Sequence, residues 1–198
     1  MPKRPRIDND NLYGVAPMQR LPTTLDGPLL LEPTVHGDAR GFFLETYRRS
    51  ALQDLGVGGE FVQDNHSRSR QGIVRGMHFQ PGMAKLVRCA RGKVVDVLVD
   101  LRRGSPAFGQ WEMFELSDSN HHHLYCPDGF AHGFCVLSDV ADVIYKTTAY
   151  YDPEREGGFA YDDPAVGIAW PDEIELSVSE RDRTAPPLAE IADALPFE

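Results

Sequence analysis

The amino-acid sequence predicts an all-β fold, either a sandwich or a barrel. Short apolar or alternating runs recur roughly every 8–12 residues, with turn-forming residues between them. The 18 Gly and 15 Pro residues make up about 17% of the chain, against an ordinary share of roughly 12%, which favours many short strands over long helices. Within 94–101 the alternation is regular, with Val or Leu at odd positions from Val95 to Leu101 and with Asp96 and Asp100 on the other face.

The predicted strands follow one another between residues 29 and 151. They are Leu29–Leu31, Gly41–Tyr47, Gly72–Gln80, Lys85–Arg91, Val94–Leu101, Gln110–Ser117, His121–Cys126, Gly133–Leu137 and Ala141–Tyr151. One short helix is predicted over Ser50–Leu55, where Ser50 is placed to cap the first turn. A second is predicted over Ala185–Leu195, where two prolines precede leucine and isoleucine at helical spacing. Residues 1–24 lack any period and predict an N-terminal extension, which leaves 25–198 as one domain.

Charge and composition restrict the classes of partner. The net charge of −10 argues against general nucleic-acid binding, which needs a basic face. The sequence contains no run of 18 apolar residues, so it predicts no membrane-spanning helix. The polar start MPKRPRIDND lacks the apolar stretch of a secretory signal. The three cysteines, Cys89, Cys126 and Cys135, form no CxxC motif, so we expect reduced thiols and a cytoplasmic protein.

Three segments carry residues suited to chemistry. In GIVRGMHFQ (72–80), the sequence leaves three roles open for His78: a metal ligand, a general base or a core histidine. Arg75 points to the opposite face of a regular strand, so it can reach the same pocket as His78 only if the strand twists or bulges at Gly76. In CPDGFAHGF (126–134), His132 follows a turn and is either functional or buried beside phenylalanines. In VIYKTTAYY (143–151), Tyr145 is either a proton donor or a core residue whose hydroxyl needs a partner.

A run of three histidines, His121 to His123, raises the question of a metal site. Alternate residues of a strand point to opposite faces, so at most two of these histidines share a face. No carboxylate at ligand spacing accompanies them. The sequence therefore favours a solvated or interface strand here over a metal centre.

The segments described so far, with several others in the same order, resemble the dTDP-4-dehydrorhamnose 3,5-epimerase family. The resemblance spans about residues 27–190 and is carried by DARGFFLETY (38–47), QDNHSRS (63–69), GIVRGMHFQ (72–80), KLVRCARGKVVDVLVDLRRGSPAFG (85–109), PDGFAHGF (127–134), YKTTAYY (145–151) and DDPAVGIAWP (162–171). It implies a cupin-type double-sheet jelly roll with a few short peripheral helices. It also implies a homodimer that exchanges N-terminal strands.

The resemblance implies an enzyme that epimerises a dTDP-4-keto-6-deoxyhexose without metal or other cofactor. Metal-binding cupins use an HxH pair, but here His78 is followed by Phe79 and Gln80, and His132 lies alone in a later PxGxxH pattern. Two histidines without a carboxylate fall short of the usual three protein ligands. Because C3 and C5 of the sugar both lie α to the C4 ketone, epimerisation needs a base, an acid on the opposite face and a group that stabilises the enolate.

The resemblance also assigns roles to individual residues. It makes His78 the base, Asp182 its orienting partner, Tyr145 the proton donor and Lys85 the cation that faces the developing oxyanion. The positions that match substrate contacts are Arg40, Glu45, Gln63, Asn65, Arg75, His132, Tyr151 (stacked on thymine), Glu156 and Arg181. Lys146 is expected to be a structural partner or dimer contact, and Ser67 to Ser69 to be loop residues beside the site.

Some features depart from the family pattern. The loop between Gln80 and Lys85 is short, Met77 and Phe79 replace Leu and Tyr, and Arg181 stands where Lys is usual. These changes bear on the sugar and on C3-versus-C5 selectivity more than on the reaction class.

Three alternatives remain open from the sequence. They are an epimerase that inverts only one centre, a metal-dependent cupin enzyme and a non-catalytic sugar-nucleotide binding protein. Deuterium uptake at one carbon or two, metal analysis, and binding without proton exchange distinguish them.

Overall fold

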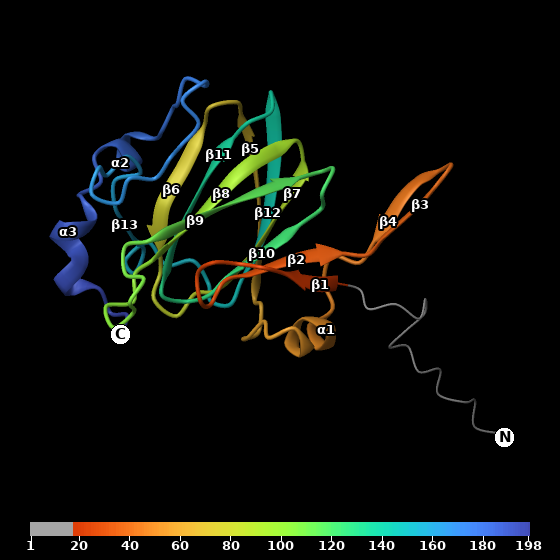
Figure 1. The fold of residues 1–198 in the computed structure, drawn as a ribbon, viewed down its shortest axis with the longest axis horizontal. Coiled ribbons are helices and arrows are strands. Elements are labelled where there is room, and N and C mark those ends of the chain that lie inside the picture. Colours follow the sequence, from red (N-terminus) through yellow and green to blue (C-terminus); the bar gives the residue numbers. More distant parts are fainter. Residues whose placement is uncertain (1–17) are drawn as a thin grey trace.

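Two antiparallel β-sheets face each other, with short helices at the periphery (Figure 1). The computed structural model describes residues 18–198. In spatial order, the first sheet contains β1 (Met18–Leu21), β2 (Leu29–Pro33), β10 (His123–Cys126), β7 (Lys85–Arg91), β12 (Val140–Thr147) and β5 (Gln63–Arg70). The second contains β13 (Gly157–Gly158), β6 (Val74–Phe79), β11 (Phe130–Val136), β8 (Lys93–Asp100) and β9 (Trp111–Ser117). This architecture confirms the predicted double-sheet jelly roll.

The space between the sheets is filled by apolar side chains from both of them. Val87 and Leu124 come from the first sheet, and Leu98 and Val136 from the second. A second cluster covers the outer face of the second sheet, where Phe197 and Leu188 of the C-terminal segment pack against β8. Both faces of β8 are thus buried, and the face that carries Asp96 and Asp100 is turned away from solvent as well.

In the part of the chain that the structure describes, three short helices and one separate hairpin complete the fold. The helices are α1 (Arg49–Asp54), α2 (Glu180–Arg183) and α3 (Leu188–Ile191), and a 3-10 turn (Ala192–Ala194) follows α3. The hairpin of β3 (Val35–Asp38) and β4 (Gly41–Leu44) extends away from the two sheets (Figure 1). None of the helices within residues 18–198 is long and apolar enough to cross a membrane.

The structure corrects several sequence-based expectations. Residues 67–69 lie in strand β5 rather than in a loop. Because β5 is a polar edge strand, its sequence shows no alternation of apolar residues. Ser50 does not cap α1, whose N-cap is Arg48 and has no side-chain cap bond. The C-terminal helix is shorter than predicted, with Pro187 as the N-cap of α3.

Strand β1 lies within the predicted extension and pairs with β2, so residues 18–21 belong to the first sheet. The rest of the predicted extension, residues 1–17, falls outside the described residues.

The three-histidine run does not form the solvated or interface strand that was expected. Only His123 lies in β10, where it is 2% exposed. His121 has a positive φ of 56° in the preceding turn, and its carbonyl oxygen lies 3.0 Å from His123 Nδ1. Within residues 18–198, no group of three or more His, Cys, Asp or Glu residues lies close enough together to hold a metal ion.

The buried His123 predicts a dependence of stability on pH. Burial lowers its pKa to about 4, and the charge of nearby Arg88 contributes; the small cavity beside it is also lined by Asp64 and Lys146. An unfolded histidine titrates near 6.5, so the unfolded chain binds more protons between these values. We expect the free energy of unfolding to fall by up to about 3 kcal/mol from this residue as the pH drops from 6.5 to 4.

Urea unfolding of the wild type and of His123→Gln between pH 4 and 7.5 measures the slope of the free energy of unfolding against pH. The variant should lose much of it, although buried His132, whose pKa is also lowered, contributes in the same direction. Asp142 titrates in a lower window, since hydrogen bonds from Arg68 hold its pKa at about 2. An unchanged slope in His123→Gln would contradict the assignment.

Candidate active site

Two adjoining cavities lie among side chains of both sheets. The larger has a volume of about 490 Å³ and the smaller about 290 Å³, and they share Lys85, Tyr145 and Glu156. Predicted site residues that line the larger cavity are Arg75, His78, Lys85, His132, Tyr145, Glu156, Arg181 and Asp182. Those that line the smaller are Gln63, Asn65, Lys85, Tyr145, Tyr151 and Glu156. Eleven predicted site residues from distant parts of the sequence therefore lie together around these two cavities.

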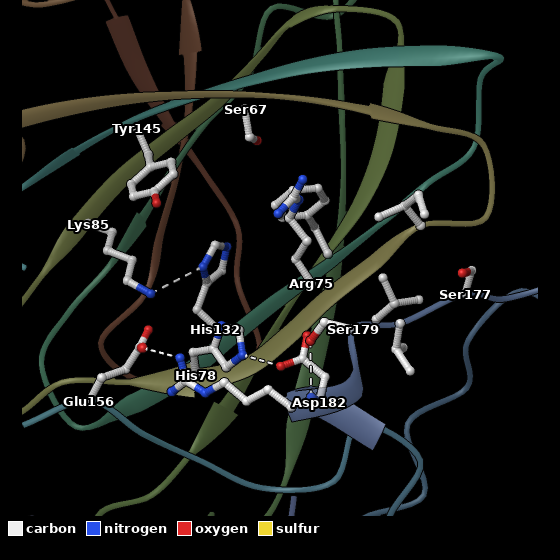
Figure 2. A pocket seen from close by; sticks show the side chains of 15 residues that line it. Ser67, Arg75, His78, Lys85, His132, Tyr145, Glu156, Ser177, Ser179 and Asp182 are labelled. Atoms are coloured by element: carbon white, nitrogen blue, oxygen red, sulfur yellow. Dashed lines mark hydrogen bonds and ion pairs between the residues drawn. The ribbon is translucent and has the colours of Figure 1, made fainter. Parts of the chain in front are cut away.

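His78 and Asp182 form a hydrogen-bonded pair in the larger cavity (Figure 2). His78 Nε2 lies 2.7 Å from Asp182 Oδ1. Burial pushes the pKa of Asp182 upward, but the hydrogen bond and charge of His78 outweigh it and hold the pKa below its usual value. An ionised carboxylate accepts, so Nε2 carries the hydrogen and the lone pair of the neutral ring is on Nδ1. This tautomer is suited to a base.

The helix α2 brings Asp182 to His78. Ser179 is its N-cap, and the Ser179 Oγ accepts from the backbone N–H of Asp182 at 3.1 Å. The SERD segment is thus a short form of the capping signature in which Ser or Thr precedes an acidic residue by three positions. Sequence reasoning assigned Asp182 without predicting this helix, although the capping pattern was a signal for it.

Gly76 lets Arg75 and His78 reach the same cavity, as the sequence predicted. The pairing of β6 with β11 shifts register between His132 and Phe134, opposite this glycine. The φ of Gly76 is 149°, and a Cβ there would lie 2.5 Å from the Cα of Gly133. Any larger residue would push the two strands apart.

A second pair of a histidine with an aspartate, His132 and Asp96, lies beside Lys85. His132 Nε2 lies 2.9 Å and 3.0 Å from the two carboxylate oxygens of Asp96, and Lys85 Nζ lies 3.5 Å from His132 Nδ1. Burial lowers the pKa of His132, and the charge of Lys85 adds to this against the opposing effect of Asp96. Asp96 is completely buried and did not feature among the predicted site residues.

Tyr145 reaches the cavity from the opposite sheet to His78. It lies on β12 of the first sheet, whereas His78 lies on β6 of the second. Figure 2 shows the Tyr145 hydroxyl and the His78 ring on different sides of the pocket, with the Lys85 ammonium group to one side between them. Burial raises the pKa of Tyr145, and the charge of Glu156 adds to this, so the phenol stays protonated near neutral pH.

The smaller cavity combines amide groups with an aromatic side chain. Gln63 donates to the Asn65 Oδ1 at 3.0 Å, and its own amide oxygen accepts from the backbone N–H of Tyr151 at 3.0 Å. The Tyr151 hydroxyl donates to Glu156 at 3.0 Å, and Arg181 pairs with the same carboxylate oxygen. Half of the Tyr151 side chain surface is open, as stacking on a flat ring requires.

Two predicted substrate contacts, Arg40 and Glu45, do not line either of these two adjoining cavities. Arg40 is in the turn of the β3–β4 hairpin, almost fully exposed, and pairs with Asp38. Glu45 follows the hairpin and pairs with Arg48. Lys146, in contrast, is the structural partner that was expected, since it pairs with Asp64 at 2.6 Å and lies over the ring of Tyr47.

Sequence reasoning missed the apolar wall of the larger cavity and two of its serines. The wall contains Ile73, Val74, Phe134 and Val178, and the missed serines are Ser177 and Ser179. Ser67, which was expected beside the site, also lines the cavity. An apolar residue beside a polar site carries no signal of its own in a sequence, because the core needs the same residue types.

The chain is also similar to known proteins in sequence and in fold. The family model described as dTDP-4-dehydrorhamnose 3,5-epimerase matches residues 22–190. A dTDP-4-dehydrorhamnose 3,5-epimerase of Methanothermobacter thermautotrophicus is 46% identical over 180 residues, which cover 89% of this chain and 97% of the relative.

Solved structures give the same result. A dTDP-6-deoxy-D-glucose-3,5-epimerase of Legionella pneumophila in complex with dTDP-4-keto-L-rhamnose has a TM-score of 0.88 and 44% identity, covering 91% of this chain and 98% of the other. A 3'-monoepimerase of Streptomyces bikiniensis in complex with dTDP-quinovose has a TM-score of 0.83 and 36% identity, covering 87% and 89%. The chain belongs to the dTDP-4-dehydrorhamnose 3,5-epimerase family, whose members are isomerases.

Proposed function

We propose that this protein epimerises dTDP-4-keto-6-deoxy-D-glucose at C3 and C5 through an enolate. The observation that carries the proposal is the placement of His78 and Tyr145 on opposite sheets, with Lys85 between them in the same cavity. Inversion of a carbon centre requires proton removal from one face and proton delivery to the other. A base on one sheet and an acid on the other meet that requirement without movement of the sugar between sites.

The proposed reaction begins with proton transfer from C3 or C5 to His78. The electron pair of the C–H bond forms a double bond to C4, and the ketone oxygen becomes an enolate oxygen. A carbon acid is far weaker than imidazolium, whose reference pKa is about 6.5, and each unit of mismatch costs about 1.36 kcal/mol. The Lys85 ammonium lowers this cost by stabilising the oxyanion, and Asp182 stabilises the imidazolium.

The second half of the proposed reaction is delivery of a proton from Tyr145 to the opposite face of the carbon. The electron pair of the carbon–carbon double bond forms the new C–H bond, a lone pair of the enolate oxygen re-forms the C4 ketone, and the centre is inverted. Solvent restores the proton to the phenolate and removes one from the imidazolium. The same cycle at the other carbon completes the double epimerisation, and no redox step is involved.

We place the nucleotide in the smaller cavity and its approaches. The amides of Gln63 and Asn65 offer donors and acceptors to a thymine, and the open face of Tyr151 offers it a stacking surface. Arg75 and Arg181 supply positive charge for the diphosphate. This local charge allows a protein of net charge −10 to hold an anionic substrate.

Replacement of Tyr145 by phenylalanine separates the two halves of the reaction. We expect Tyr145→Phe to lower the rate of inverted product formation by roughly 10²-fold, because the acid on that face is lost. Exchange of the α-hydrogens with deuterated water should persist more strongly than inversion, since His78 is intact. Proton NMR measures both quantities on one sample, with Tyr150→Phe, an exposed neighbour, as the control. Inversion at the wild-type rate would contradict the role of Tyr145.

The proposal includes a homodimer in which the hairpin of one copy completes the site of the other. Phe42 and Phe43 on the hairpin are 62% and 61% exposed, which is unusual for adjacent large apolar side chains. Arg40, which matches a substrate contact, lies at the tip of the same hairpin. A cytoplasmic location is also proposed, and the three buried cysteines, which form no disulfide with one another, support a reducing compartment.

Mixing two inactive variants tests the exchange. If Arg40 serves the partner's site, dimers formed from Arg40→Ala and His78→Asn chains contain one complete site, so the mixture should recover about a quarter of wild-type activity. Size-exclusion chromatography with light scattering should show a dimer for the wild type and a monomer for Phe42→Glu combined with Phe43→Glu. Mixtures as inactive as their components would show that Arg40 acts within its own chain.

A further inference from the structure

A buried carboxylate on β8 has one close polar partner among the described contacts. Asp96 is completely buried, and both of its oxygens lie within 3.0 Å of His132 Nε2. A buried carboxylate without a donor is costly, so His132 must present a hydrogen to it. The Nε2 atom of His132 therefore carries the hydrogen.

This assignment fixes what the other ring nitrogen can do. With the hydrogen on Nε2, the Nδ1 of a neutral ring is an acceptor, and the Lys85 Nζ lies 3.5 Å from it. Burial and the charge of Lys85 both lower the pKa of His132, which keeps the ring neutral. A neutral acceptor attracts one N–H of the ammonium group and leaves its other hydrogens free.

We infer that Asp96 and His132 are positioning residues that aim the Lys85 ammonium at the substrate oxyanion. A lysine side chain is flexible at four bonds and is a poorly directed donor unless it is held. Here Lys85 comes from β7 of the first sheet, and the pair that holds it comes from β11 and β8 of the second. The inference rests on the proposed function, because it assigns Lys85 to the enolate.

This inference changes the role expected for His132. The resemblance placed His132 among substrate contacts, but its Nδ1 has no hydrogen to donate to a sugar oxygen and already faces Lys85. Its position beside His78, with which it is paired across β6 and β11, brings it near the reacting atoms without making it an acid or a base.

Two substitutions of His132 separate positioning from a purely structural role. The amide of His132→Asn falls near the place of Nδ1 and can still accept from Lys85, but it cannot reach Asp96. The amide of His132→Gln falls near the place of Nε2 and can still donate to Asp96, but it offers Lys85 no acceptor. We expect His132→Gln to lower kcat by roughly 10²-fold with little change in KM, and His132→Asn to lower it by less than about tenfold.

The Lys85→Met background provides a control. There His132→Gln should cause almost no further loss of kcat, because the residue it positions is gone. The opposite ranking of the two variants, with His132→Asn the weaker enzyme, would overturn the inference. So would full additivity of His132→Gln with Lys85→Met.

A measurement that does not depend on activity completes the test. In ¹⁵N-histidine-labelled wild-type protein, His132 should show a protonated Nε2 and an unprotonated Nδ1 from pH 6 to pH 8, and the Nδ1 signal should shift in Lys85→Met. A protonated Nδ1 would overturn the inference even if both His132 variants failed to fold. If the wild type failed to exchange substrate hydrogens, the proposed function would fail while this NMR result still decided how His132 is held.

Discussion

Substitution of His78 by asparagine is expected to reduce hydrogen exchange at both C3 and C5 by roughly 10³-fold. Asparagine fills part of the same space, but its amide falls near the place of Nδ1, short of the Asp182 carboxylate that pairs with Nε2, and it cannot accept a proton from carbon at neutral pH. The loss should appear in kcat, with KM for the dTDP-sugar nearly unchanged, because the smaller cavity and its proposed nucleotide contacts are intact. Proton NMR in deuterated water measures exchange at each carbon separately.

Asp182→Asn is the matched comparison for this prediction. It leaves His78 in place but removes the charge that fixes the Nε2–H tautomer and stabilises the imidazolium. Its rate should therefore lie between those of the wild type and His78→Asn. Exchange in His78→Asn within tenfold of the wild type would show that another group removes the proton.

Substitution of Lys85 by methionine is expected to lower kcat by about 10²- to 10³-fold. Methionine keeps most of the unbranched stem and removes the positive charge, so the enolate oxygen would form without its cation. Both carbons share the C4 ketone, so exchange at C3 and at C5 should fall by similar factors. The measurement is the same NMR assay, together with thermal unfolding to show that the fold is kept.

Lys146→Met is the control for Lys85→Met. Lys146 lies next to Tyr145 in β12 but pairs with Asp64 outside the two cavities that contain the proposed substrate site. We expect its kcat to stay within about twofold of the wild type, since exposed ion pairs contribute little. Equal losses in the two lysine variants would mean that Lys85 acts through general charge rather than through contact with the oxyanion.

The sequence predicted the sheets better than their edges. Lys85–Arg91 was predicted at its observed bounds, since an apolar strand between turns leaves a clear pattern. Edge strand β5 was missed because QDNHSRSR contains no apolar residue. Its backbone pairs with β12, which is far away in the sequence. Such a strand is formed by its neighbour rather than by its own propensities.

The candidate site was predictable in its residues more than in its contacts. The resemblance named both His78 and Asp182, and in the structure His78 Nε2 lies 2.7 Å from Asp182 Oδ1. Asp96 was visible as a polar position in an alternating strand, but only the three-dimensional fold shows that its face is buried against His132. The distant hairpin position of Arg40 could not be read from the sequence either, because it depends on how the hairpin leaves the sheets.

The most direct test of the central claim is proton NMR of the wild-type protein with dTDP-4-keto-6-deoxy-D-glucose in deuterated water. We predict deuterium at both C3 and C5, with signals of the doubly inverted 4-keto sugar growing as the substrate signals decline. Deuterium at only one carbon would keep the mechanism and restrict the protein to a single centre, as in the 3'-monoepimerase relative. Folded protein that exchanges neither hydrogen would contradict the account.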